Sequence, residues 1–193
     1  MKRTKFAAAL AVLTLLTTLT GCGQAKEADR ALEPVTLNEV AHSIFYAPQY
    51  AAIELGYFKD EGIALTLVNG AGADKVMTAL ISGDADIGFM GSEASIYVYQ
   101  EGSADYAVNF AQLTQRAGNF LVGRSAEPDF SWQDLKGKKV LGGRAGGMPE
   151  MVFEYILKKN GIDPKNDLTI DQSINFGLTA AAFTSNDADY TVV

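Results

Sequence analysis

The chain has 193 residues, of which 48% are hydrophobic and 20% are charged. This composition supports a buried core and excludes a disordered chain, a collagen and a coiled coil. The formal net charge is -7 and no run of basic residues is longer than a pair, which excludes sequence-independent nucleic-acid binding.

The chain holds one cysteine, Cys22, and one histidine, His42. A single cysteine excludes an intramolecular disulfide and a cysteine-rich metal site. A single histidine removes most histidine-based catalysis. The glycines of residues 142–147 lack Gly-x-Gly-x-x-Gly spacing, and no Lys-Ser or Lys-Thr pair completes a phosphate loop. The sequence therefore predicts no cofactor and no metal.

Residues 1–21 have the pattern of an export signal. A basic start, formed by Lys2, Arg3 and Lys5, precedes an apolar stretch at residues 6–19. This stretch is too short to span a membrane, because a membrane-spanning helix needs about 20 residues. The sequence Leu-Thr-Gly before Cys22 resembles the bacterial lipobox, in which the cysteine becomes the acylated first residue. We expect lipidation at Cys22, a polar tether at residues 22–34, and a location on the outer face of the cytoplasmic membrane.

Strand and helix signals alternate from residue 35, which predicts an α/β fold with mostly parallel sheets covered on both faces. The first helix is expected from Pro48 to a stop at Gly56. In the first half, further helices are expected at residues 74–81 and 92–100, and strands at residues 35–41, 63–68, 87–90, 106–113 and 120–122.

The second half repeats this order, with strands expected at residues 139–141 and 168–170 and helices at 149–160 and 178–184. Residues 84–86 and 187–189 both read Asp-Ala-Asp, each after a helix end and an αL-tolerant Gly83 or Asn186. The repeat predicts two similar lobes, at residues 35–115 and 116–193. The second copy stops inside or at the end of its last strand, so we expect a chain whose second lobe is incomplete at its C-terminus.

Glycine-bearing loops follow several predicted strands, at the sheet edge where ligands bind in open parallel sheets. Such loops allow a ligand close to the backbone and to helix N-termini, although any one of them could be a simple turn. The residues expected to bind ligand are Ser43, Phe45, Tyr46, Gly70, Gly72, Gly91, Ser92, Arg116, Gly146, Gly147 and Met148.

The aromatic and basic candidates carry alternatives. One of Phe45 and Tyr46 is expected to pack under the following helix rather than stack on a ligand. Trp132 is expected in the core of the second lobe, and the role of Phe176 is left open. Arg124 and Arg144 are expected to be solvated surface charges.

Glu93 and Glu150 fall in the first turns of two helices whose N-termini should face the cleft. There they would satisfy the helix dipole and repel a bare oxyanion, which favours a neutral or cationic ligand. The alternative is that both only cap solvated helices.

Residues 42–50, 54–63, 82–88 and 134–140 resemble the bacterial solute-binding lipoproteins that serve importers of nitrate, sulfonate, taurine and the thiamine pyrimidine precursor. The resemblance covers nearly all of residues 35–193. It implies a two-lobed type II periplasmic-binding fold that closes on a small molecule, and places Ser43, Tyr46, Gly70, Gly72, Gly91, Ser92 and residues 146–148 in ligand loops. Partners would be an ABC permease and ATPase, with the receptor a monomer held to the membrane only by lipid. Members of that family are longer than this chain.

Two other functions are weighed against an import receptor. The same family includes an iron-dependent pyrimidine-precursor synthase that consumes an active-site histidine, a role for which His42 is the one candidate. A lipoprotein with an adhesive or structural role would show a flat cleft poor in aromatic residues. We expect a binding protein and not an enzyme.

Overall fold

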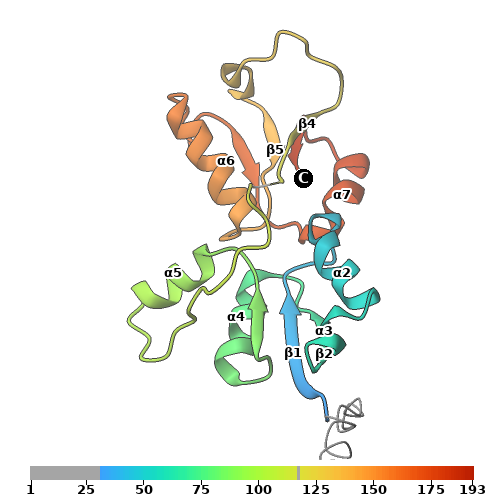
Figure 1. The fold of residues 1–193 in the computed structure, drawn as a ribbon. Helices are drawn as coiled ribbons and strands as arrows, with labels where there is room; N and C mark the ends of the chain where they lie inside the picture. The colour runs from blue at the N-terminus through green and yellow to red at the C-terminus, as the bar shows by residue number, and fades with distance from the viewer. Residues whose placement is uncertain (1–30, 117) are drawn as a thin grey trace, which may run out of the picture. The chain divides into compact units, whose positions relative to one another are not determined.

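The computed structural model describes residues 31–116 and 118–193 (Figure 1). The expected export signal, Cys22 and most of the expected tether lie outside the described residues. Residues Glu33–Val193 form one compact unit.

The first sheet has three parallel strands in the order β2-β1-β3. Strand β1 (Glu33–Glu39) lies in the middle, so that Leu37 pairs with both Leu67 and Ile87. The outer strands are β2 (Ile63–Asn69) and β3 (Ile87–Phe89). Four α-helices and a 3-10 helix accompany this sheet: η1 (Ile44–Tyr46), α2 (Ala47–Glu54), α3 (Tyr57–Asp60), α4 (Ala73–Ser82) and α5 (Glu93–Gln100).

Local sequence explains where these helices begin and end. Pro48 lies in the first turn of α2, where its missing N–H costs nothing. Helix α4 ends at Gly83, whose φ of 82° is a left-handed conformation that glycine adopts without strain. Val76 and Met77 of α4 are buried. The apolar face of α4 therefore covers the sheet.

The second sheet has four strands in the order β4-β7-β5-β6. Strand β5 (Lys139–Leu141) pairs in parallel with β6 (Thr169–Asp171) and β7 (Tyr190–Val192), while β4 (Leu121–Gly123) runs antiparallel to β7. Its helices are η2 (Trp132–Leu135), α6 (Met148–Lys159), η3 (Phe176–Leu178) and α7 (Thr179–Ser185).

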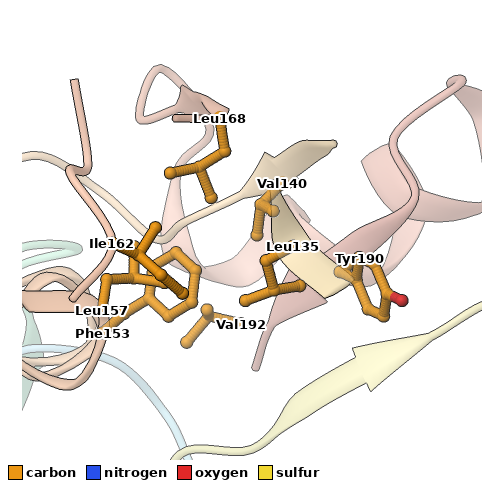
Figure 2. Close-up of a cluster of buried hydrophobic side chains, with 8 residues drawn as sticks. All are labelled: Leu135, Val140, Phe153, Leu157, Ile162, Leu168, Tyr190 and Val192. Atoms are coloured by element: carbon orange, nitrogen blue, oxygen red, sulfur yellow. The ribbon is translucent and has the colours of Figure 1, made fainter. Parts of the chain in front are cut away.

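A hydrophobic core joins α6 to the second sheet (Figure 2). Phe153 and Leu157 of α6 meet Val140 of β5 and Val192 of β7, and Leu157 and Val140 are fully buried. Trp132 packs against this cluster from η2, as the sequence predicts. Truncation of a buried leucine in such a cluster typically costs about 2–5 kcal/mol.

The Asp-Ala-Asp repeat has the same geometry in both halves. The carboxylate of Asp86 accepts the backbone N–H of Thr36 at 2.8 Å, and that of Asp189 accepts the backbone N–H of Lys139 at 2.9 Å. The backbone N–H of each aspartate donates in turn to the carbonyl of the same partner, at 3.0 and 2.8 Å. Each motif thus ties its strand to the central strand of its sheet.

Two predictions about local structure are wrong, and one short helix was not predicted. Residues 106–113 form no strand; Val108 and Phe110 are about three-quarters exposed, because no neighbouring strand in the described part of the chain pairs with them. Helix α3 was not expected, since its single turn is too short to show a period. Asn186 is extended rather than left-handed, and its side chain instead accepts the N–H of Ala188 at 3.0 Å.

The sheets use residues 33–89 and 121–192. The lobe limits of 35–115 and 116–193 stay a prediction. In the described residues, no helix is long and apolar enough to cross a membrane.

Candidate ligand-binding site

A cavity of about 690 Å³ lies within the unit formed by Glu33–Val193. This is the size of a typical small-molecule site. Its walls come from loops and helix N-termini of both sheets: the segment that leads into α2, the starts of α4 and α5, the segment around Arg116, and the loop between β5 and α6. Each wall of the first sheet follows a strand at its carboxyl end, where loops of parallel sheets gather.

Nine of the eleven residues expected to bind ligand line this cavity: Ser43, Phe45, Tyr46, Gly72, Gly91, Arg116, Gly146, Gly147 and Met148. The structure therefore brings together residues from five segments that are far apart in sequence. Their contact with a ligand stays a prediction.

Gly70 and Ser92 are not among the residues that line the cavity in the described structure. A Cβ on Gly70 would lie 2.6 Å from Oδ1 of Asn38 and 2.8 Å from Val76, so this glycine permits close packing between β1 and α4. The carbonyl of Ser92 accepts the hydroxyl of Ser95 at 2.8 Å within the first turn of α5. Both residues thus have local structural roles.

Aromatic rings supply much of the cavity wall. The ring of Tyr46 lies 4.3 Å from that of Phe89, whereas Phe45 is 44% exposed and lies over Gly118. Burial and then the charges of Glu39 and Glu93 raise the pKa of Tyr46. Phe176, whose role could not be decided from the sequence, also lines the cavity. The rings of Phe89 and Tyr97 were missed, because apolar spacing on a strand or helix marks a core as readily as a ligand wall.

Arg144 is a partly exposed surface charge, as the sequence suggested, but it is also paired. Its guanidinium forms a two-pronged ion pair with Asp74 at the start of α4, with Nη2 at 2.8 Å from Oδ2. Hydrogen bonding to the arginine holds the pKa of Asp74 below its usual range. The pair links the loop after β5 to the helix after β2, and both residues line the cavity.

Arg124 is exposed, as the sequence suggested, but it also bonds to the backbone. It donates to the carbonyl oxygens of Phe183, Asn186 and Ala188, at 2.6 to 2.8 Å. Its guanidinium carbon lies 4.4 Å from the centre of the Phe183 ring. Arg124 therefore satisfies the carbonyls at the C-terminal end of α7, where a positive charge is favourable.

Glu93 and Glu150 lie in the first turns of α5 and α6 and are both buried, so the alternative that they cap solvated helices is wrong. Glu150 accepts the N–H of Gly146 at 3.2 Å and the side-chain amide of Gln172 at 2.9 Å. Glu93 is 3% exposed, and its Oε2 has no hydrogen-bond partner among the described residues. Burial raises the pKa of both carboxyls, with the backbone N–H groups of Glu93 and Met148 partly opposing the rise at Glu93.

A third buried carboxylate, that of Glu39, was not predicted from the sequence. It ends β1 at 1% exposure and accepts the Gln49 amide at 3.0 Å, the Tyr50 hydroxyl at 2.9 Å and Nδ1 of His42 at 3.0 Å. The His42 ring stacks on Tyr50 at 4.3 Å and is not part of the cavity wall. In the described residues, no group of three or more His, Cys, Asp or Glu side chains could hold a metal ion.

Comparisons with known proteins identify relatives. Residues 44–193 match the family model described as "NMT1/THI5 like". The chain is 47% identical over 176 residues to "Putative binding protein YtlA" of Bacillus subtilis (strain 168), a match that covers 91% of this chain and 52% of that protein.

Solved structures show the same fold. The aliphatic sulphonate binding protein SsuA of Escherichia coli matches with a TM-score of 0.55 and 18% identity, over 83% of this chain and 54% of that one. A binding protein component of an ABC phosphonate transporter from Pseudomonas aeruginosa matches with a TM-score of 0.52 and 14% identity, over 84% and 58%. The α/β fold of a periplasmic binding protein is therefore confirmed. The chain spans about half the length of these relatives.

Proposed function

Because this chain belongs to the NMT1/THI5-like family, we propose that it is the extracytoplasmic solute-binding protein of an ABC importer. It captures a small organic molecule or oxyanion, such as a thiamine pyrimidine precursor or a sulfonate, in the cavity between its lobes. It then delivers the molecule to the permease. The curated relative and the solved neighbours are named as binding proteins, which supports binding rather than catalysis.

One observation carries the proposal: loops of both sheets wall the same cavity. Gly72 and Gly91 contribute from the first sheet, and residues 146–148 from the second. A ligand held there would contact both lobes at once. Such a ligand stabilises the closed state, because its contacts with both lobes exist only when the lobes meet.

The two lobes already touch at the cavity in a way that suits closure. Besides the pair of Arg144 and Asp74, the hydroxyl of Tyr97 lies 2.7 Å from the sulfur of Met151. Both contacts are polar and largely exposed, so each contributes little to stability alone. Weak contacts of this kind leave opening and closing accessible to a ligand-driven shift.

The location also belongs to the proposal. Acylation at Cys22 would hold the mature protein on the outer face of the cytoplasmic membrane, beside its permease and ATPase. Labelling of cells with a radioactive fatty acid tests this: the label should appear on the protein and be absent from the Cys22→Ala variant. An unlabelled wild-type protein would contradict the anchor.

The alternative of an iron-dependent synthase relied on His42 as a reacting group. His42 instead pairs with Glu39 and stacks on Tyr50, and it does not line the cavity. The adhesive alternative required a flat cleft poor in aromatic residues, whereas the cavity wall contains Phe45, Tyr46 and Phe89. No observation on the structure favours either alternative over the receptor.

A thermal-shift screen of the purified protein tests the proposal, with pyrimidines, sulfonates, nitrate and amino acids as candidates. A ligand at 100 times its Kd should stabilise the fold by about 2.7 kcal/mol and raise the Tm. The shift should be lost in Phe45→Ala and kept in Tyr155→Ala, because Tyr155 is an exposed residue of α6 outside the cavity. Equal shifts in both variants would contradict binding in this cavity.

A further inference from the structure

Three of the helices that begin at the cavity carry an acid in the first turn. These acids are Asp74 of α4, Glu93 of α5 and Glu150 of α6. A helix N-terminus carries a partial positive charge that would otherwise attract an anionic ligand. Here the protein's own carboxylates occupy that position on α4, α5 and α6, whereas α2, whose N-cap Tyr46 also lines the cavity, has no acid in its first turn.

The backbone donors of the loop before α6 are also engaged. The N–H of Ala145 donates to the carbonyl of Gln172, that of Gly146 to the Glu150 carboxylate, and that of Gly147 to the carbonyl of Arg144. A glycine-rich loop can cradle an oxyanion only through free N–H groups. At residues 145–147 the N–H groups already donate within the protein.

Arg144 on the cavity wall is also occupied by a partner within the protein. Arg144 gives both terminal nitrogens to Asp74, and its guanidinium lies where a Cβ on Gly72 would stand. An oxyanion would have to compete with the Asp74 carboxylate for the two terminal nitrogens of this guanidinium. Arg116 is the other basic residue on the wall.

Glu93 points to the opposite kind of ligand. Its carboxyl folds over Gly91, where a Cβ would lie 2.0 Å from Oε2, so glycine is required there for the carboxyl to reach its place. Oε2 is buried without a donor among the described residues, although both Glu93 and Gly91 belong to the cavity wall. A buried acceptor without a donor is unfavourable, and a ligand N–H that donates to it would remove that penalty.

Resting on the proposed function, we propose that the ligand presents N–H donors to Glu93, as an amidine, a guanidine or an amino-substituted nitrogen heterocycle does. The aromatic wall suits the flat body of such a molecule, since Phe45, Tyr46 and Phe89 offer faces and edges to a ring. The cavity thus selects a neutral or cationic donor group over a sulfonate or phosphonate.

Benzamidine and benzenesulfonate test this selection, because they share a ring and differ only in the charged group. Calorimetric titration of the purified protein should show benzamidine binding at least about tenfold more tightly than benzenesulfonate. Glu93→Gln should weaken benzamidine about tenfold or more, as loss of a hydrogen bond to a charged group does. Glu61→Gln, which removes an exposed acid outside the cavity, should leave the affinity unchanged.

A second variant tests whether the acid paired with Arg144 disfavours an anionic ligand. Asp74→Asn removes the negative partner of Arg144, so it should strengthen benzenesulfonate and leave benzamidine at Glu93 in place. Circular dichroism checks that each variant is folded.

The outcomes separate the two proposals. Tighter binding of benzenesulfonate to the wild-type protein, or an unchanged benzamidine affinity in Glu93→Gln, would overturn the donor-ligand inference while the receptor function stands. Failure of both probes, together with failure of every compound in the thermal-shift screen, would overturn the inference and the receptor function together.

Discussion

Glu39 shows how a single buried charge can organise the loop beside the cavity. It ends β1, and its carboxylate collects donors from Gln49 and Tyr50 of α2 and from His42 of the connecting loop. Buried charges are tolerated when each lone pair has such a partner. The cluster therefore fixes the path of residues 43–46, which carry three of the residues that line the cavity.

Tyr50→Phe tests this cluster. The hydroxyl of Tyr50 donates to Glu39 at 2.9 Å and accepts the N–H of Ser43 at 3.1 Å, so the variant loses both bonds. We expect it to lower the free energy of unfolding by about 1–3 kcal/mol, measured by urea denaturation. Tyr155→Phe, at an exposed hydroxyl on α6, serves as the control. Equal stability of the two variants would show that the cluster contributes nothing.

Glu93 makes a prediction about pH. Burial raises the pKa of this carboxyl above 4.5, so the folded state holds its proton more tightly than the unfolded chain does. The fold therefore loses stability as the pH rises from the unfolded value through the folded one. Glu93→Gln, which cannot ionise, should be more stable than wild type at pH 7 and equal to it at pH 4. Denaturation curves across this range measure it; a gain that is the same at both pH values would contradict it.

At the scale of elements, the spacing of apolar residues and the positions of helix-ending glycines predicted the limits of helices and strands well. This holds where the segment packs on a sheet or pairs with a neighbouring strand. Strand β5 was predicted with its observed limits, and α4 to within a residue at each end, because Gly83 ends its apolar period. The prediction of a strand at residues 106–113 was wrong, because a β-rich sequence becomes a strand only beside another strand. Local pattern cannot supply that partner.

Some features of the candidate site could be predicted from the sequence and others could not. Loops after strands can be found in a sequence, and nine of their predicted residues line the cavity. The pair of Arg144 and Asp74 joins residues 70 positions apart, and the burial of Glu93 depends on how α5 lies against its surroundings. Both are products of tertiary packing, for which one sequence gives no signal.

The repeated Asp-Ala-Asp elements predict matched effects. Asp86→Ala and Asp189→Ala each remove one carboxylate that holds the central strand of a sheet. Each should lower the free energy of unfolding by about 1–2 kcal/mol, with the part-buried Asp189 more costly. The first aspartate of the motif gives the control, because Asp84 bonds only to the neighbouring Ser82 hydroxyl. Chemical denaturation measures all three, and a cost for Asp84→Ala as large as the others would contradict the shared role.

For the whole molecule, the ion pair of Arg144 and Asp74 is expected to bias the lobes toward closure. Arg144→Met removes it and should widen the distance distribution between nitroxide labels on the exposed residues Tyr99 of α5 and Tyr155 of α6. Pulsed electron paramagnetic resonance measures that distribution. High salt should widen it in the wild-type protein for the same reason, since an exposed pair is screened. A variant with the wild-type distribution would show that the pair does not govern closure.

A crystal structure of the protein with a ligand found by the thermal-shift screen tests the proposed site most directly. We expect the ligand inside the cavity, in contact with Phe45 and Gly91 from the first sheet and with residues 146–148 from the second. A ligand bound instead in the apolar groove beside Trp132 and Tyr190, or on one sheet alone, would contradict it.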